Sequence, residues 1–230
     1  LVGSEMCIRD RYLADMGCGT RQEVKKFIRS GQVSVDGIVV KKPETKVEQT
    51  VQEVFLNGEK VGYESFEYYM LNKPAGVISA TEDQSCQTVV DLIKDKKRKD
   101  LFPVGRLDKD TEGLLLITND GALAHRLLSP KKHVDKCYFA RICGKVTEED
   151  VRSFEKGVNI GSQEQPEITM PGKLEIITSD DISKIRLTIQ EGKFHQVKRM
   201  FQAVGKEVIY LKRLRMGTLI LDENLGIGEY

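Results

Sequence analysis

The feature that most constrains the fold is a short apolar run in the middle of the chain. Leu114 to Ile117 carry no polar side chain, and a run of this length bounded by turn residues is typical of a buried strand. Asn119-Asp120-Gly121 follows as a turn, and the polar loop Gly105–Gly113 precedes it. We therefore expect a strand at 114–118 with a polar loop leading directly into it.

Short strand and helix patterns alternate along the chain from Tyr68 onward. They lack the regular spacing of repeated strand–helix–strand units, which favours an α+β domain with a mixed, mainly antiparallel sheet. Thr147 is placed to cap one of the helices. The expected strands are 68–71, 114–118, 138–142, 174–178 and 185–190, and the expected helices are 122–128, 148–156 and a short one after His195.

The first segment, to about Tyr63, predicts a helix followed by a hairpin. Thr20 and Glu23 form the capping-box pattern of a helix over 21–30, and Gly31 ends it. Asp36-Gly37 between two β-prone runs predicts a tight hairpin.

That helix has two distinct faces. Its apolar stripe consists of Val24, Phe27 and Ile28. Its basic stripe consists of Arg21, Lys25 and Arg29. A compact unit with a basic helix face is suited to contact RNA phosphates, although an ordinary solvated helix has the same pattern.

Composition excludes several classes of protein. With 31% charged and 40% hydrophobic residues in 230, and no long apolar stretch, we expect a protein without membrane spans. No secretory leader is recognisable, so the expected location is the cytoplasm. The net charge of +1 argues weakly against nucleic-acid binding, but its distribution matters more. Basic clusters, each also consistent with a solvated face, lie at 94–99, 131–132, 198–199 and 212–215.

Five cysteines and three histidines show no metal-ligand spacing. We therefore expect free thiols and no metal site.

Candidate chemistry begins in the loop before the apolar strand. An aspartate such as Asp108, if supported by a cation or hydrogen bonds, serves as a nucleophile or general base. The alternative is that Asp108, Asp110 and Thr111 are only turn and cap residues. Tyr138, on an expected strand, is either a core residue or a ring that stacks on a nucleobase.

The stretch after Glu191 supplies a suitable cation. On a helix, Lys198 borders the inward stripe and can present its ammonium to a cleft, whereas Arg199 points away toward solvent or ligand. His195 is better suited to a phosphate contact or a structural hydrogen bond than to a role as base. The inward stripe consists of Val197, Met200, Phe201 and Val204.

Five ordered stretches share a resemblance to one family. They are YMLNKPAGV at 69–77, GRLDKDTEGLLLITNDG at 105–121, LSPKKHVDKCY at 128–138, EGKFHQVKRMF at 191–201 and LDENLGIGEY at 221–230. Together they resemble the bacterial ribosomal RNA pseudouridine synthases, most closely the small-subunit 16S rRNA uridine-to-pseudouridine branch. The segment from Tyr12 to about Lys60 resembles the alpha-L RNA-binding domain that precedes the catalytic domain in that branch.

The resemblance implies specific roles. Asp108 matches the essential aspartate, Tyr138 the tyrosine that stacks on the target base, and Lys198 the basic residue paired with the aspartate. Val197 matches the apolar residue lining the pocket, and Arg106 the arginine that holds the nucleotide site open. The implied reaction is an isomerisation and needs no cofactor.

The expected organisation is an RNA-binding domain at 12–60 and a catalytic domain at 64–230. Residues 1–11 resemble a translated sequencing adaptor and are set apart. The expected partner is ribosomal RNA or a pre-ribosomal small-subunit particle, bound by a monomer.

Three alternatives stay open on the sequence. The target could be large-subunit RNA, or the protein could be a non-catalytic RNA-binding ribosome-assembly factor. A glycoside or nucleoside hydrolase would need a second carboxylate, for which Asp110 or Glu112 would have to serve.

Overall fold

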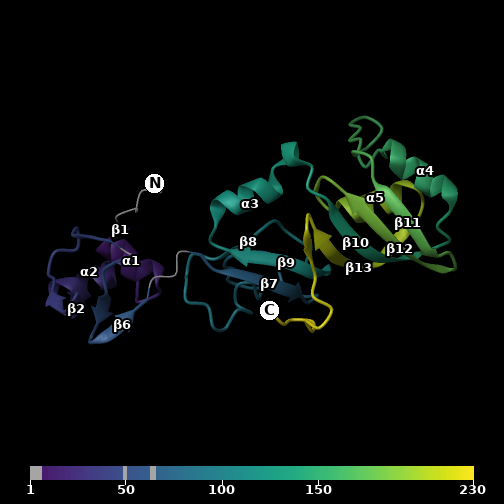
Figure 1. Ribbon diagram of the computed structural model, residues 1–230. Coiled ribbons are helices and arrows are strands. Elements are labelled where there is room, and N and C mark those ends of the chain that lie inside the picture. Colours follow the sequence, from purple (N-terminus) through teal and green to yellow (C-terminus); the bar gives the residue numbers. More distant parts are fainter. Residues whose placement is uncertain (1–6, 49–50, 63–65) are drawn as a thin grey trace. The chain divides into compact units, whose positions relative to one another are not determined.

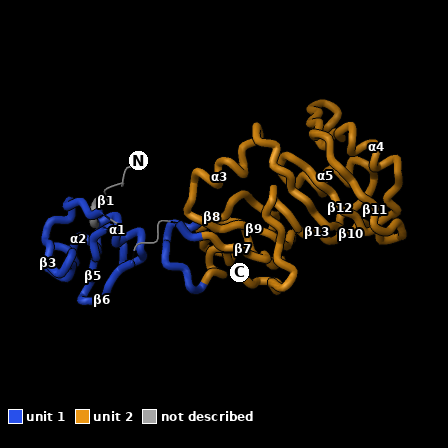
Figure 2. Tube along the Cα trace, viewed as in Figure 1, with its two compact units in different colours: residues 1–67, 94–101 blue, residues 68–93, 102–230 orange. Residues whose placement is uncertain are grey.

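The computed structural model describes residues 7–48, 51–62 and 66–230 (Figure 1). The chain forms two compact units, which differ in size (Figure 2). The first comprises residues 1–67 together with 94–101, and the second comprises 68–93 together with 102–230. The predicted α+β organisation, a small N-terminal domain followed by a larger one, is confirmed.

One segment departs from the expected organisation. Lys94–Leu101 belongs to the first unit, whereas the expected boundaries assign it to the catalytic domain. A second difference lies near the N-terminus, where helix α1 (Arg9–Asp15) begins before Tyr12, the expected start of the RNA-binding domain. Tyr12 and Leu13 are buried in the core of this unit, so α1 is an integral part of it.

The first unit begins with two helices, of which the sequence predicts the second. Helix α2 (Arg21–Arg29) starts at the predicted capping box: the Glu23 amide donates to Thr20 Oγ1 at 3.3 Å, and the Thr20 amide donates to Glu23 Oε2 at 2.8 Å. Val24 and Ile28 are fully buried, which confirms the apolar stripe. The capping box fixes where the helix starts, because it satisfies amides that lack a partner within the helix.

Two hairpins complete the first unit. The predicted one turns at Asp36 and Gly37, which both have positive φ, as the tight turn requires. A second hairpin, which the sequence analysis does not predict, turns at Asn57-Gly58 in the same way. The four-stranded sheet has the order β3-β2-β5-β6, and a separate pair joins β1 to β4. The strands are β1 (Cys7–Ile8), β2 (Val33–Val35), β3 (Ile38–Val39), β4 (Lys46–Val47), β5 (Val54–Leu56) and β6 (Glu59–Val61).

The second unit is built on an eight-stranded sheet. Its central path has the order β11-β12-β10-β13-β9-β7, with β14 added to β13 and β8 added to β9. Every pairing is antiparallel except that of β13 with β9, so the predicted mixed, mainly antiparallel sheet is confirmed. The strands are β7 (Tyr68–Lys73), β8 (Phe102–Pro103), β9 (Glu112–Thr118), β10 (Lys136–Cys143), β11 (Lys173–Thr178), β12 (Ile182–Ile189), β13 (Glu207–Met216) and β14 (Leu219–Ile220).

Helices cover the buried face of this sheet (Figure 1). Strands β10 and β12 alternate buried and more exposed side chains, as expected for a sheet covered on one side. The Phe154 and Phe201 rings, from two different helices, lie 5.0 Å apart and join those helices over the sheet. The helices are α3 (Gly121–Leu128), the 3₁₀ turn η1 (Pro130–Lys132), α4 (Glu148–Lys156) and α5 (Gln196–Ala203).

The parallel contact between β9 and β13 depends on one glycine. Gly113 has φ +98°, and a Cβ there would lie 2.3 Å from the Arg213 carbonyl oxygen. Only glycine allows the two strands to approach this closely at the point where the polar loop enters β9. In the described part of the chain, no helix is long and apolar enough to cross a membrane.

Candidate active site

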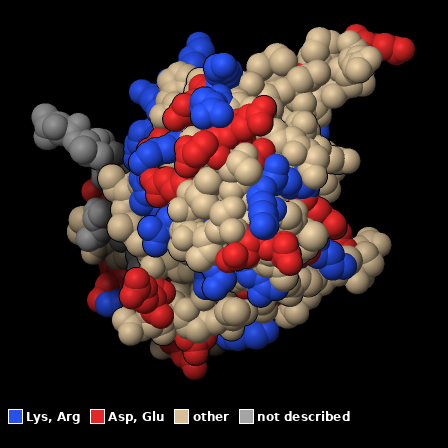
Figure 3. Space-filling view, turned by 90° about the vertical axis from the view of Figure 1, so that its right-hand side faces the viewer, with Lys and Arg blue, Asp and Glu red and all other residues tan. Residues whose placement is uncertain are grey.

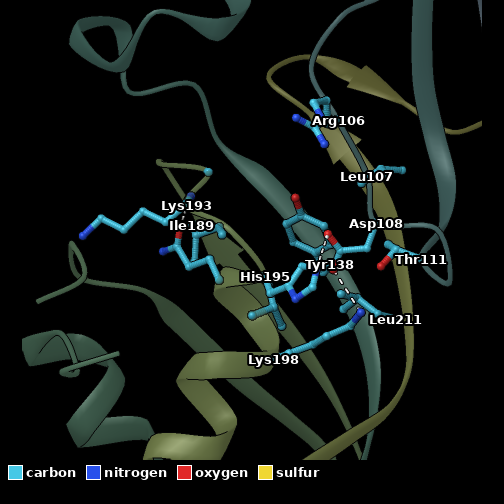
Figure 4. A pocket seen from close by; sticks show the side chains of 13 residues that line it. Arg106, Leu107, Asp108, Thr111, Tyr138, Ile189, Lys193, His195, Lys198 and Leu211 are labelled. Carbon is cyan, nitrogen blue, oxygen red and sulfur yellow. Dashed lines mark hydrogen bonds and ion pairs between the residues drawn. The ribbon is translucent and has the colours of Figure 1, made fainter. Parts of the chain in front are cut away.

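The loop before β9, strand β10, strand β13 and the start of α5 enclose a pocket (Figure 4). The buried strand β9 fixes one end of the loop, and the buried face of α5 fixes the opposite wall. The described residues that line the pocket are Arg106, Leu107, Asp108, Thr111, Tyr138, Ile189, Gly192, Lys193, His195, Gln196, Val197, Lys198 and Leu211. The structure thus brings Arg106, Asp108, Tyr138, Val197 and Lys198 together.

Lys198 forms ion pairs with two carboxylates in this pocket. Its Nζ lies 3.0 Å from Asp108 Oδ2 and 2.6 Å from Asp110 Oδ1. The predicted pairing of Lys198 with Asp108 is confirmed. The contact with Asp110 is not predicted, and it means that Asp110 is more than a turn residue. One ammonium therefore neutralises part of a negatively charged loop.

Helix α5 determines where the ammonium lies. Val197, Met200 and Phe201 are buried, so they fix the helix against the sheet. Lys198 sits at the border of this stripe with 26% of its side chain exposed, as predicted. Burial alone would lower the pKa of Lys198, but hydrogen bonds to Asp110 and Asp108 outweigh it and raise the pKa. Lys198 is therefore a permanent cation at neutral pH.

Asp110 responds to the same contact. Its side chain is 71% exposed, so water screens the ion pair. The hydrogen bond from Lys198 is the largest effect and lowers the pKa of Asp110, against a smaller opposing effect of burial. Asp108 is the more enclosed of the two carboxylates, with 26% of its side chain exposed.

Tyr138 supplies an aromatic wall. It lies on β10, where it pairs with Leu187 of β12 and Arg213 of β13, and it is only 7% exposed. Its ring lies next to the Asp108 side chain in the pocket (Figure 4). A ring held between two strands offers a rigid face at the side of a carboxylate.

His195 forms the other side of the pocket. It is the residue before α5, in the left-handed conformation with φ +47°. Its Nε2 lies 3.6 Å from Asp108 Oδ1, which is longer than a hydrogen bond. The imidazole stacks on the Phe194 ring at a centroid distance of 3.8 Å. No local sequence pattern predicts this proximity to Asp108.

The segment after β7 forms hydrogen bonds with the backbone of the Asp108 loop. Ser79 Oγ donates to the Leu107 carbonyl at 2.9 Å and accepts from the Leu107 amide at 3.0 Å. The Gly76 amide donates to the Lys109 carbonyl at 2.7 Å. The backbone on both sides of Asp108 is therefore fixed by the same neighbouring segment.

Lys73 is buried beneath this loop. Its Nζ donates to the carbonyls of Pro74 at 2.9 Å, Lys109 at 3.2 Å and Thr111 at 2.9 Å. Burial lowers the pKa of Lys73 to about 8, although the nearby carboxylates of Asp110, Asp108 and Glu112 oppose the shift. Both Lys73 and the Pro74 that follows lie in the YMLNKPAGV stretch, which is the only sequence signal that marks this support.

Arg199 points away from the buried stripe, as the helix geometry predicts, but it contacts protein on that side. Its Nη2 donates to Glu167 Oε2 at 2.6 Å and to the Ile160 carbonyl at 2.7 Å, and Nη1 donates to the Phe194 carbonyl. The guanidinium therefore faces protein rather than solvent or ligand, and Arg199 does not line the pocket. The prediction that it faces solvent or ligand is wrong because a loop around Ile160 folds over that side of α5.

The basic residues predicted on the first helix lie in the other unit. Arg21, Lys25 and Arg29 are exposed on α2, and Lys25 Nζ lies 3.6 Å from Asp10 Oδ2. Across the described residues of both units, no group of three or more His, Cys, Asp or Glu side chains is arranged to hold a metal ion.

Known proteins resemble this chain over nearly its whole length. An uncharacterized RNA pseudouridine synthase of Bacillus subtilis is 52% identical over 96% of this chain and 92% of its own. The ribosomal small subunit pseudouridine synthase A of Vibrio cholerae is 39% identical over 96% and 93%. A crystal structure of a pseudouridylate synthase matches with a TM-score of 0.66 at 36% identity and covers 96% of this chain and 93% of its own.

Two family models divide the chain between them. The S4 domain model matches residues 10–52, and the model described as RNA pseudouridylate synthase matches residues 67–203. The second match includes the Asp108 loop, Tyr138 and the start of α5 through Lys198. The enclosed carboxylate, the aromatic wall and the paired lysine thus lie in the part of the chain that the family model describes, and the chain belongs to the RNA pseudouridylate synthase family.

Proposed function

We propose that this protein converts a uridine of 16S ribosomal RNA to pseudouridine, with Asp108 as the essential catalytic residue. The relatives named as small-subunit pseudouridine synthases support the choice of RNA. The observation that carries the proposal is the Asp108 carboxylate, enclosed between the Tyr138 ring and the Lys198 ammonium at 3.0 Å.

The reaction exchanges one bond for another within the nucleotide. The target uridine leaves its stack and enters the pocket. The bond between ribose C1′ and uracil N1 breaks, the uracil turns, and a bond forms between C1′ and C5. C5 loses a proton and N1 gains one, so atoms and charge balance without a redox step. Asp108 assists this cleavage as a nucleophile or a base, both of which require the ionised carboxylate.

The other pocket residues position the base and the charge. Tyr138 stacks on the uracil, since aromatic faces bind unpaired bases well. Val197 packs against it, and Arg106, which also lines the pocket, holds the nucleotide site open. The Lys198 ammonium, 3.0 Å from Asp108 Oδ2, holds the carboxylate in position until substrate arrives.

RNA binding is assigned to the N-terminal part of the chain. The match to the S4 domain supports an RNA-binding role for residues 12–60, ahead of a catalytic domain at 64–230. Arg21, Lys25 and Arg29 on α2 contact phosphates without reading sequence. The protein acts as a monomer in the cytoplasm on ribosomal RNA or a pre-ribosomal small-subunit particle.

Pseudouridine mapping of ribosomal RNA tests the proposal. We expect cells that lack the protein to lose one pseudouridine in 16S RNA and to regain it when the wild-type protein is restored. Loss from the large-subunit RNA would reassign the substrate but keep the reaction. Free uracil released from RNA by the purified protein would instead indicate a hydrolase, and an unchanged map would favour a non-catalytic assembly factor.

A further inference from the structure

The first unit contains a basic groove that lies apart from the α2 face. The groove has a cavity volume of about 520 Å³. One wall comes from the early part of the chain and the other from Lys94–Lys99, the segment that follows Ile93 and joins this unit. The described residues that line it are Met16, Gly17, Lys60, Val61, Gly62, Lys94, Lys96, Lys97, Arg98 and Lys99.

The segment is held in a defined shape. The Glu67 carboxylate accepts the backbone amides of Lys97 at 3.1 Å and Arg98 at 3.0 Å. The Arg98 side chain is 4% exposed, and its Nε and Nη2 donate to both carboxylate oxygens of Asp100 at 2.9 and 2.6 Å. Its Nη2 also lies 3.7 Å from Asp15 Oδ2, at the end of α1.

This anchoring separates two kinds of basic residue. Arg98 turns inward and is neutralised by carboxylates, whereas Lys94, Lys97 and Lys99 are exposed. A charge run that was merely solvated would need neither a buried arginine nor a carboxylate that caps its backbone. These contacts fix the backbone from which the lysine side chains project.

The residues that line the groove include basic but no acidic side chains, and two of the basic ones, Lys60 and Arg98, pair with Glu53 and Asp100 outside the lining. Lysine and arginine make up six of the ten described lining residues, and none of these ten is acidic. By contrast, the pocket beside α2 mixes Arg11, Arg21 and Lys25 with Asp10 and Glu44. Basic and acidic side chains also lie interspersed over the face shown in Figure 3. Concentrated positive charge in a concave site attracts a polyanion most strongly.

The chemistry of the lining indicates which part of a nucleic acid would be bound. The described lining residues include no aromatic ring on which a base could stack. Lysine ammonium groups are point charges that suit phosphate oxygens without reading the base sequence. The groove is thus matched to an RNA backbone rather than to an unpaired base.

We propose that this groove is a second RNA-binding site, which holds backbone phosphates of the substrate through Lys60, Lys94, Lys96, Lys97 and Lys99. The inference rests on the proposed function, because it takes the polyanion to be the RNA substrate. The groove would be a phosphate site in addition to the α2 face. It includes residues outside the segment that the S4 model matches.

The test uses charge removal at the three exposed lysines of the segment. The full-length triple variant Lys94→Gln, Lys97→Gln, Lys99→Gln is titrated with a labelled 16S RNA fragment between 50 and 200 mM salt. Each lost phosphate contact should lower the slope of log affinity against log salt by about 0.7 to 0.9, so the slope should fall by about two to three.

Two matched variants control for net charge and for folding. Lys41→Gln, Lys42→Gln, Lys46→Gln removes the same charge from exposed positions of the same unit outside the groove, and should lower the slope much less. Arginine at 94, 97 and 99 keeps the charge and should keep the wild-type slope. A groove variant whose slope equals that of the wild type or of the outside control overturns the proposal.

Pseudouridine formation by the wild-type protein on the same RNA separates this inference from the proposed function. If the wild type modifies the RNA but the groove variant keeps its salt dependence, only the groove assignment fails. If the wild type forms no pseudouridine while the slope still falls in the groove variant, the RNA-binding site stands and the proposed reaction fails.

Discussion

Lys198 lies on a helix and Asp108 on a loop of a different segment, yet their charged atoms are 3.0 Å apart. The helix is fixed by its buried stripe and the loop by Ser79 and Lys73, so the two groups meet through rigid elements. The same ammonium contacts Asp110 at 2.6 Å. One shared cation therefore pairs with two carboxylates in the pocket.

Replacing Lys198 with Met should change the pH dependence of the reaction. The hydrophobic side chain retains the packing of the lysine stem but leaves Asp108 and Asp110 without their cation. Loss of one nearby opposite charge should move the acid limb of the pH–rate profile upward by about one pH unit. Single-turnover rates measured from pH 5 to 8 check this shift.

Lys193→Met is the matched control for that experiment. Lys193 also lines the pocket, but its Nζ lies near Glu167 and Glu191 rather than Asp108. Its removal should leave the acid limb in place. An equal shift in both variants would mean that the limb reports the general charge of the pocket and not the Lys198 pair.

Ser79→Ala should slow the reaction without removing any pocket group. The hydroxyl bonds both the amide and the carbonyl of Leu107, so its loss frees the backbone just before Asp108. We expect a cost of about 1 to 2 kcal/mol in unfolding free energy. We also expect a rate decrease of about tenfold from misplacement of the carboxylate.

Ser85→Ala provides the comparison for Ser79. Ser85 is an exposed serine that bonds Asp83 on the same stretch of chain, away from Leu107. Chemical denaturation and single-turnover rates should both remain near wild type for this variant. If Ser79→Ala behaved the same way, the hydroxyl clamp would have no part in positioning Asp108.

Lys73 should make the stability of the protein depend on pH above neutrality. Its pKa is about 8 in the folded protein and near 10.5 when unfolded, so the unfolded chain binds more protons between these values. The contribution of Lys73 to the free energy of unfolding should therefore rise as pH increases from about 8 to 10.5.

Comparison of wild type with Lys73→Met isolates this effect from other titrating groups. The variant should be less stable, because the Pro74, Lys109 and Thr111 carbonyls lose their donor. The difference in unfolding free energy should grow by about 1 to 3 kcal/mol over that pH range. A difference that stayed constant with pH would show that Lys73 keeps its ordinary pKa in the fold.

Local signals predicted much of the fold correctly. The capping box at Thr20 and Glu23 and the Asp36-Gly37 turn are short-range interactions, so a few residues determine them. The apolar run at 114–117 predicts strand β9, because a strand that is buried on both faces has consecutive apolar residues. The Asn57-Gly58 hairpin has an equally strong turn signal, but its second strand begins with the charged Glu59 and Lys60 and lacks the β-prone run that flanks Asp36-Gly37.

The candidate site was predictable only in part. Helix periodicity correctly placed Lys198 at the border of the buried stripe, but it says nothing of what covers the other side. Arg199 points away from that stripe as expected, but its contacts with Glu167 and Ile160 are not predictable from the helix, because these partners lie on a distant loop. The contacts of Lys198 with Asp110 and of Lys73 with the Asp108 loop arise from tertiary packing, which no local pattern encodes.

The substitution Asp108→Asn tests whether Asp108 is the essential catalytic residue. Asparagine keeps the size of the side chain but removes its charge and nucleophilic oxygen. Loss of covalent or base catalysis should lower the rate by several orders of magnitude. RNA affinity should change little, because phosphate contacts elsewhere supply most of the binding.

Single-turnover pseudouridine formation on a small-subunit RNA fragment, with a binding titration of each variant, is the deciding measurement. Asp110→Asn is the control. Because the Asp110 side chain is 71% exposed, this substitution should lower the rate by less than about tenfold. We expect intact RNA binding and almost no product for Asp108→Asn. A variant that retained more than about a tenth of the wild-type rate would contradict the role of Asp108 and the mechanism built on it.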